Sequence, residues 1–300
     1  MKKILIIGTA LLLLAAGCNK AKNNASSNSS TNNIGNMQGM DHSSMNIGNS
    51  PIQSHRTYSL NMLSSLDNIQ PGKPTTVKFN IKDEQGNVLK DFQLTHTKIL
   101  HLIVVRKDLQ QFQHIHPDLN QQSGEFTIAL NFPTDGPYRI FDDFAPQGAQ
   151  MGPDGMPLMV TLNQDVTVGD MAKYKAVPVA VDKDAQKITD NYFINYDFSP
   201  ELKAQSTITY SLQIEKDAEE VKLEPYLGAM GHSVILKVGA LDYIHTHANE
   251  MAMDATEGMQ MSHAGVEFTT SFPEAGVYRI FTQFQVKGKI ITSDYTVQVK

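Results

Sequence analysis

Three histidines recur at the same spacing in two parts of the chain. The segment 101-HLIVVRKDLQQFQHIHPD-118 aligns without a gap with 232-HSVILKVGALDYIHTHAN-249. The aligned positions are His101, His114, His116, His232, His245 and His247. Because imidazole is a common ligand of Cu²⁺ and Zn²⁺, each triplet is a candidate metal site with a coordination position left open.

The spacing within each triplet fits neighbouring β-strands. Residues two apart on a strand point to the same face, so His114 and His116 can converge on one ion, and His101 begins a run that can return beside them. We therefore expect one site in each half of the chain, or about two ions per chain. The alternative is that these histidines serve packing and hydrogen bonding at strand ends.

Two carboxylates follow the first triplet. Asp142 and Asp143 are candidate acceptors for the N–H groups of metal-binding imidazoles. The corresponding positions of the second half hold Thr282 and Gln283. We therefore expect that this role is not shared by the two halves.

Methionine is concentrated in three loop-like segments. A thioether in a polar segment such as 37-MQGMDHSSMN-46 cannot be explained as a core residue, but it is a soft ligand suited to Cu⁺. The candidate ligands of these segments are Met37, Met40, His42 and Met45, then Met151, Met156 and Met159, then Met251, Met253, Met259, Met261 and His263.

The N-terminus has the pattern of a bacterial lipoprotein signal. Lys2 and Lys3 precede an apolar run that ends in 14-LAAGC-18, which resembles a lipobox with Cys18 as the acylated residue. We expect residues 1–17 to be removed and residues 18–54, rich in Asn and Ser, to form a disordered tether. The protein would then be lipid-anchored to the extracytoplasmic face of the cell membrane.

Composition excludes several other classes of site. Cys18 is the only cysteine, so no disulfide, thiolate zinc site or cysteine nucleophile is expected. The net charge of −6, without a basic run after the signal, argues against nucleic acid as a partner.

The repeat extends beyond the histidines and predicts the fold class. The run 126-FTIALNFPTDGPYRIFDDF-144 matches 268-FTTSFPEAGVYRIFTQF-284, and short β-favouring runs alternate with turn residues in both halves. We predict an all-β protein of two tandem antiparallel β-sandwiches, immunoglobulin-like or cupredoxin-like. The predicted boundaries are 55–169 for the first sandwich, 170–190 for a linker and 191–300 for the second.

Two resemblances bear on function. The pattern 100-LHLIVV-105 with 112-FQHIHP-117, repeated as 226-YLGAMGHSVIL-236 with 243-YIHTH-247, resembles a poorly characterised family of secreted or lipid-anchored bacterial domains with an HLxVV…HxHP signature. That resemblance implies heavy-metal handling. The tail motif 40-MDHSSM-45 is similar to the Met/His motifs of copper-resistance proteins.

These features together predict an extracytoplasmic copper-binding lipoprotein. Met-rich segments would hold Cu⁺ and the histidines Cu²⁺, with zinc as an alternative metal, for sequestration of copper or its delivery to a membrane copper transporter. A metal-dependent extracytoplasmic enzyme is a second, less favoured interpretation, with Glu125 and Asp143 as candidate acid–base residues. A third is a tandem-sandwich binding protein whose histidines are structural.

Overall fold

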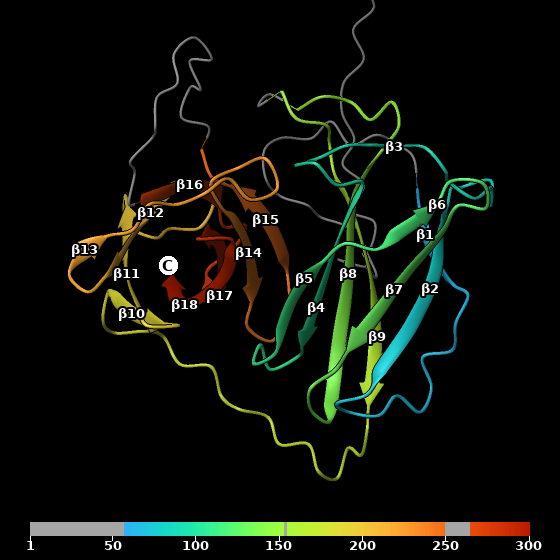
Figure 1. The fold of residues 1–300 in the computed structure, drawn as a ribbon, viewed down its shortest axis with the longest axis horizontal. Coiled ribbons are helices and arrows are strands. Elements are labelled where there is room, and N and C mark those ends of the chain that lie inside the picture. Colours follow the sequence, from blue (N-terminus) through green and yellow to red (C-terminus); the bar gives the residue numbers. More distant parts are fainter. Residues whose placement is uncertain (1–56, 153–154, 250–264) are drawn as a thin grey trace, which may run out of the picture. The chain divides into compact units, whose positions relative to one another are not determined.

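All regular elements of the described residues are β-strands. A computed structural model describes residues 57–152, 155–249 and 265–300 (Figure 1). These residues contain no helix long and apolar enough to cross a membrane. The predicted all-β class is confirmed.

The first copy of the repeat is a sandwich of two antiparallel sheets. One sheet has the order β1-β2-β7-β6 and the other the order β5-β4-β8-β9, with β3 paired to the end of β8. The strands are β1 (Ser59–Met62), β2 (Pro74–Lys82), β3 (Phe92–Gln93), β4 (Leu100–Arg106), β5 (Phe112–Ile115), β6 (Asp118–Asn120), β7 (Glu125–Asn131), β8 (Gly136–Pro146) and β9 (Val160–Val168).

The second copy repeats this arrangement. Its sheets have the orders β11-β12-β16 and β15-β14-β17-β18, with β10 beside β11 and β13 paired to the end of β12. The strands are β10 (Gln186–Thr189), β11 (Tyr192–Ser199), β12 (Thr207–Lys216), β13 (Glu219–Glu220), β14 (His232–Lys237), β15 (Tyr243–His247), β16 (Gly265–Ser271), β17 (Gly276–Val286) and β18 (Lys289–Val299). The prediction of two tandem antiparallel sandwiches is therefore confirmed.

Strand order resolves the choice between the two predicted sandwich types. In the first copy, β1, β2, β7 and β6 take the places of strands A, B, E and D of an immunoglobulin domain, and β4, β8 and β9 those of C, F and G. The hydroxyl of Tyr138, near the start of β8, donates to Thr134 O at 3.1 Å, and Tyr278 donates to Glu274 O at 2.9 Å. Such a tyrosine corner is typical of immunoglobulin-like sandwiches.

The central strands β4 and β14 are covered on both faces. Successive side chains of a strand point to opposite sides. In β4, Leu102 and Val104 belong to the core of the first sandwich, whereas Ile103 and Val105 pack against residues of β14. His101 has the same parity as Ile103 and Val105, so this alternation aims it away from the core of its own sandwich.

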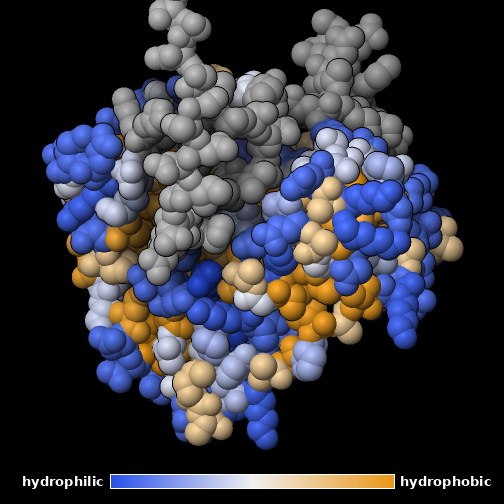
Figure 2. Space-filling model, turned by 180° about the vertical axis from the view of Figure 1, so that it is seen from behind, coloured by the Kyte–Doolittle hydropathy of each residue, from blue (hydrophilic) through white to orange (hydrophobic). Residues whose placement is uncertain are grey.

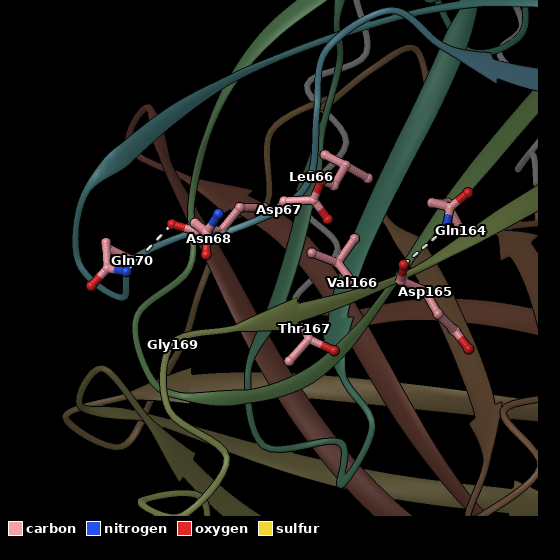
Figure 3. Close-up of a pocket in the computed structure, with 10 residues that line it drawn as sticks. Leu66, Asp67, Asn68, Gln70, Gln164, Asp165, Val166, Thr167 and Gly169 are labelled. Atoms are coloured by element: carbon pink, nitrogen blue, oxygen red, sulfur yellow. Dashed lines mark hydrogen bonds between the residues drawn. The ribbon is translucent and has the colours of Figure 1, made fainter.

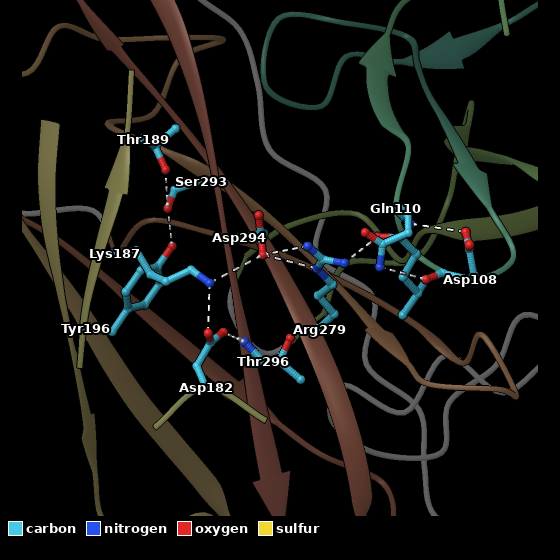
Figure 4. A network of polar contacts seen from close by, with 11 residues as sticks. Asp108, Gln110, Asp182, Lys187, Thr189, Tyr196, Arg279, Ser293, Asp294 and Thr296 are labelled. Carbon is cyan, nitrogen blue, oxygen red and sulfur yellow. Dashed lines mark hydrogen bonds and ion pairs between the residues drawn. The ribbon is translucent and has the colours of Figure 1, made fainter. Parts of the chain in front are cut away.

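The two sandwiches contact each other through a small apolar cluster and polar bonds beside it. The ring of Phe112 stacks on that of Phe281 with centroids 4.3 Å apart. Arg279 donates to Leu109 O at 2.8 Å while it pairs with Asp294 at 2.7 Å, so one guanidinium links both copies (Figure 4).

The linker in the structure is shorter than the predicted linker at 170–190. Residues 186–189, assigned to the linker at 170–190, form β10 and pair with β11. The turn between these strands contains Asp190 and Asn191, with φ of 50° and 65°. Adjacent residues with positive φ are typical of tight β-hairpins, and Asp and Asn tolerate that backbone, so the Asp-Asn pair is the signal that was missed.

Candidate functional site

The six repeated histidines form one cluster across the two copies. The ring of His101 lies 5.3 Å from that of His245 and 6.2 Å from that of His232, measured between centroids. His114 and His232 are 6.0 Å apart by the same measure. The histidine-bearing faces of the two copies meet, so the expectation of a separate site in each half is corrected for the first triplet, whereas His232, His245 and His247 form a group by themselves as predicted.

Strand register explains the convergence. His232 of β14 is paired with His247 of β15, and Val234 with His245, so all three histidines share one face. In the first copy, His114 of β5 is paired with Ile103, and His116 follows the end of that strand. The even spacing that keeps side chains on one face of a strand thus places each triplet on the outer face of its own sheet.

Two groups of imidazoles have donor nitrogens close enough to share a metal ion. In each group, one nitrogen from every histidine lies within 4.8 Å of the others. The groups are His101, His114 and His245, and His232, His245 and His247. His245 belongs to both, and the first group mixes the two copies. His116 lies beside the first group, with Nε2 3.2 Å from His101 Nδ1.

Backbone carbonyls fix the proton positions of two histidines. His101 donates from Nε2 to Thr95 O, and His232 donates from Nε2 to Tyr226 O, each at 3.0 Å. In a neutral imidazole the other nitrogen then carries the lone pair. Both rings therefore present an unprotonated Nδ1.

Side chains of the opposite copy fix the proton positions of two further histidines, His245 and His114. His245 donates from Nδ1 to Asp143 Oδ2 at 2.8 Å, and His114 donates from Nδ1 to Gln283 Oε1 at 2.9 Å. Gln283 in turn donates from Nε2 to Thr292 Oγ1 at 2.9 Å. His245 and His114 therefore present Nε2 as the free donor atom. The expectation that only the first half supplies such an acceptor is wrong, because Gln283 does so for His114.

Several of these nitrogens lack a hydrogen-bond partner. Within the described residues, the buried atoms without one include Nδ1 of His96 and His232 and Nε2 of His245 and His247. His114 Nε2 faces His101 Nδ1 at 3.0 Å, and the bonds to Gln283 and Thr95 leave both atoms without a proton. A cation between such lone pairs removes their repulsion and replaces the missing partners.

Burial keeps the imidazoles neutral. It lowers the pKa of His96 to about 4, of His116 to about 3 and of His232 to about 2. Burial also lowers the pKa of His101, His114, His245 and His247. Neutral imidazole is the form that binds a metal ion, so the cluster needs no deprotonation at neutral pH.

Asp143 is the carboxylate of the cluster. It accepts hydrogen bonds from His245, from Thr161 Oγ1 at 2.9 Å and from Tyr243 Oη at 3.3 Å. Burial raises its pKa to about 6, so it is ionised at neutral pH. Its neighbour Asp142 points to the other side of β8, where burial raises its pKa to about 8 and no described group bonds it.

His96 also belongs to the cluster, although the repeat gave no reason to select it. It lies in the tight turn between Thr95 and Lys98 with a φ of 50°, and its ring stacks on that of His247 with centroids 3.4 Å apart. The corresponding residue of the second copy is Leu227. Alignment of the copies therefore gives no signal for His96, and the only indication in the sequence that it belongs to the cluster is its proximity to His101.

The other predicted site residues lie elsewhere or outside the described residues. Met151 is exposed, and Met156 and Met159 are half-buried in the segment between β8 and β9. Glu125 pairs with Lys78 at 2.7 Å on β7, outside the cluster. The residues outside the described part are Cys18, Met37, Met40, His42, Met45, Met251, Met253, Met259, Met261 and His263.

A polar pocket of about 450 Å³ lies in the first sandwich (Figure 3). It is lined by 66–70, 164–167 and Gly169. Gly136 of β8 is paired with Val168 near this pocket, whereas Asp143 is paired with Thr161 near the histidines. The lining of the pocket shares no residue with the cluster, and its nearest position along β9, Gln164, is three steps from Thr161, or roughly 10 Å of strand.

Figure 2 shows how hydrophobic and hydrophilic residues are distributed over one face of the molecule. On the face in Figure 2, hydrophobic residues lie in separate patches among hydrophilic ones. The exposed large hydrophobic residues of the described part include Leu94, Ile188 and Met151, which come from different segments.

Comparisons with solved structures reach only low structural similarity. Invasin, a bacterial integrin-binding protein, is 12% identical with a TM-score of 0.21, and the match covers 80% of this chain and 39% of that one. Escherichia coli alpha-2-macroglobulin activated by porcine elastase is 12% identical with a TM-score of 0.23, and the match covers 81% of this chain and 20% of that one. The three N-terminal domains of the bacteriophage RB49 highly immunogenic outer capsid protein are 9% identical with a TM-score of 0.20, and the match covers 82% of this chain and 70% of that one. The chain thus spans well under half of the first two proteins, and the fold assignment rests on its own strand order.

Family comparison gives a clearer result. No protein of curated function matches the sequence significantly. The family described as a domain of unknown function, DUF8832, matches residues 55–153 and 186–300, which include the second sandwich, the first sandwich except β9, and every histidine of the cluster. The chain belongs to the DUF8832 family.

Proposed function

We propose that the protein binds copper in the histidine cluster between its two sandwiches. The observation that carries this proposal is the group of His101, His114 and His245, whose donor nitrogens lie within 4.8 Å of one another with their protons directed elsewhere. Three imidazoles with an open position are a recurrent donor set for Cu²⁺ and Zn²⁺.

A purely structural role fits this arrangement less well. A buried polar atom left without a partner costs about 1–3 kcal/mol, and several nitrogens of the cluster are in that condition. Structural histidines would be expected to satisfy both ring nitrogens, as is usual for buried polar groups. A bound ion satisfies the nitrogens that face the centre, while Thr95, Tyr226, Asp143 and Gln283 satisfy those that face outward.

Copper is favoured over zinc by two arguments. Cu²⁺ binds a given set of nitrogen ligands more tightly than other divalent ions of the first transition row. The chain also carries three Met-bearing segments, and thioethers select Cu⁺ over Zn²⁺. Binding of both oxidation states suits sequestration of copper or its delivery to a membrane transporter.

The first experiment measures metal binding by the tag-free protein. We expect dialysis against Cu²⁺ or Zn²⁺ to leave at least one tightly bound ion per chain. His245→Gln should abolish most of this binding, because His245 belongs to both groups of donors. His55→Gln, which removes one imidazole that belongs to neither group of donors, is the matched control. Equal metal content in both variants would contradict the proposal.

The second experiment tests the Met-bearing tail. Replacement of Met37, Met40 and Met45 by Leu keeps the side chains apolar and of similar size but removes the sulfur atoms. Anaerobic competition with a Cu⁺ chelator should show lower Cu⁺ capacity in this variant, with unchanged Cu²⁺ binding at the histidines. Identical Cu⁺ titrations would restrict the tail to the role of a tether.

The third experiment concerns the membrane. We propose that Cys18 carries lipid and holds the sandwiches at the extracytoplasmic face, as the sequence 14-LAAGC-18 indicates. Cys18→Ser should move the protein from the membrane fraction to the soluble fraction without a change in metal content. Retention of the variant in the membrane fraction would replace the lipoprotein assignment with a signal anchor.

A further inference from the structure

Asp143 and Gln283 occupy equivalent positions in the two copies. On β8, Asp143 is paired with His101 of β4, and on β17, Gln283 is paired with His232 of β14. The position therefore lies beside the first histidine of each copy. Its side chain nevertheless bonds a histidine of the other copy, because the outer faces of the two sheets meet there.

The exchange is reciprocal. Asp143 of the first copy accepts the Nδ1 proton of His245 at 2.8 Å, and Gln283 of the second accepts that of His114 at 2.9 Å. His114 and His245 are themselves equivalent in the repeat, and both belong to the group of donors shared with His101. Each copy thus orients a ligand that the other copy supplies.

The two acceptors differ in charge. Asp143 is buried, 1% exposed, and three donors converge on it, whereas Gln283 is a neutral amide held by Thr292. A carboxylate that accepts a hydrogen bond from an imidazole N–H makes the other ring nitrogen a stronger electron-pair donor. Its negative charge also attracts a bound cation, and this attraction is strong in a medium of low dielectric constant. An amide orients the ring without supplying charge.

We propose that Asp143 and Gln283 are positioning residues that set the metal affinity of the cluster from across the interface, with Asp143 the dominant one. This inference rests on the proposed function. Asp143 would raise the metal affinity by accepting a hydrogen bond from His245, a ligand that the opposite copy supplies. The contact between the sandwiches is then part of the metal site.

The test uses isosteric exchanges in the full chain, with Cu²⁺ as the probe. Asp143→Asn should raise the dissociation constant for Cu²⁺ by 10- to 100-fold, the usual effect of losing such a partner. Gln283→Glu should lower it, because Thr292 Oγ1 can donate to the new carboxylate and His114 gains a charged acceptor. Asp165→Asn is the matched control, since Asp165 pairs with Arg139 and Lys107 on the surface.

Two further readouts separate positioning from general stability. The EPR spectrum of bound Cu²⁺ should keep its nitrogen couplings in Asp143→Asn, because His245 remains a ligand. The shift in unfolding temperature caused by Cu²⁺ should shrink in that variant relative to Asp165→Asn, whatever happens to the metal-free protein.

The outcomes distinguish this inference from the proposed function. Equal affinities and equal metal-induced shifts in Asp143→Asn, Asp165→Asn and wild type would overturn the inference alone. Absence of Cu²⁺ binding by wild type would overturn the metal site and the inference with it.

Discussion

Individual histidines show how a protein prepares a neutral donor set in a buried place. The main-chain carbonyls of Thr95 and Tyr226 accept hydrogen bonds from Nε2–H of His101 and His232. These carbonyls come from equivalent hairpin turns, 95–98 and 226–229. The repeat therefore copied the orientation of the ring together with the ring itself, and the same nitrogen, Nδ1, faces the centre in both copies.

The histidine pKa values predict that the metal-free protein loses stability in acid. Below about pH 6.5 the unfolded chain protonates its histidines, while burial keeps the folded ones neutral, so the unfolded state binds more protons. The free energy of unfolding should fall as pH falls, by about 1.4 kcal/mol per pH unit for each proton of difference. Asp142 and Asp143 act in the opposite direction but are outnumbered.

Urea unfolding of the metal-free protein at pH 7.5, 6.5 and 5.5 measures this dependence. A midpoint that stays constant, or rises toward acid, would show that the histidines are not buried as a neutral cluster. Because the pKa of both His116 and His245 in the folded protein lies below this range, substitution of either residue by Gln should reduce the slope by about the same amount.

Asp142 predicts a second pH effect, of opposite sign. Its pKa is raised by burial and by Asp143 to about 8, so between roughly pH 4 and pH 8 the unfolded state loses this proton and the folded state keeps it. Wild type thus loses stability from this group as pH rises. Asp142→Asn removes the ionisation, and its stability relative to wild type should increase from pH 4.5 to pH 8.

The exposed Asp118, exchanged for Asn, is the control for the Asp142 variant. Thermal unfolding of both variants across this range gives the comparison. A stability difference between Asp142→Asn and wild type that does not change with pH would mean that Asp142 is ionised in the folded protein.

At the scale of elements, the strands β4 and β14 connect two cores. Their even and odd residues serve different partners, one set in the core of their own sandwich and one against the other copy. The sequence carried this signal, because 101-HLIVV-105 and 232-HSVIL-236 lack the alternation of a strand with one solvated face. Such runs indicate a strand covered on both sides.

Contact between the sandwiches should therefore contribute to metal binding. Phe281 stacks on Phe112 and is 4% exposed. Phe281→Ala removes this contact and should cost about 3 kcal/mol of stability, near the lower end for a buried Phe. It should also weaken Cu²⁺ binding, because the two sets of ligands are no longer held at a fixed separation.

Phe193→Ala on β11 is the control, since Phe193 is 37% exposed and lies outside the apolar cluster of the interface. Urea midpoints and Cu²⁺ titrations compare the two variants. Unchanged metal affinity in a folded Phe281→Ala protein would show that the histidines hold their positions without this contact.

At the scale of the whole molecule, internal duplication explains what could be predicted. Strand-rich repeats predicted two sandwiches, and the aligned histidines predicted which side chains would gather. The repeat could not show that the copies face each other, because alignment compares the copies and does not place them. For the same reason it missed His96, which has no counterpart, and it gave Gln283 no role, since Gln283 differs from Asp143 in type.

In the proposed function, a metal ion lies between histidines of both copies. The most direct measurement is an anomalous difference map from crystals of the tag-free protein grown with Cu²⁺, recorded on either side of the copper absorption edge. We predict a peak bounded by His101 Nδ1, His114 Nε2 and His245 Nε2. Copper found only at other positions, or a well-ordered cluster with no peak, would contradict the account.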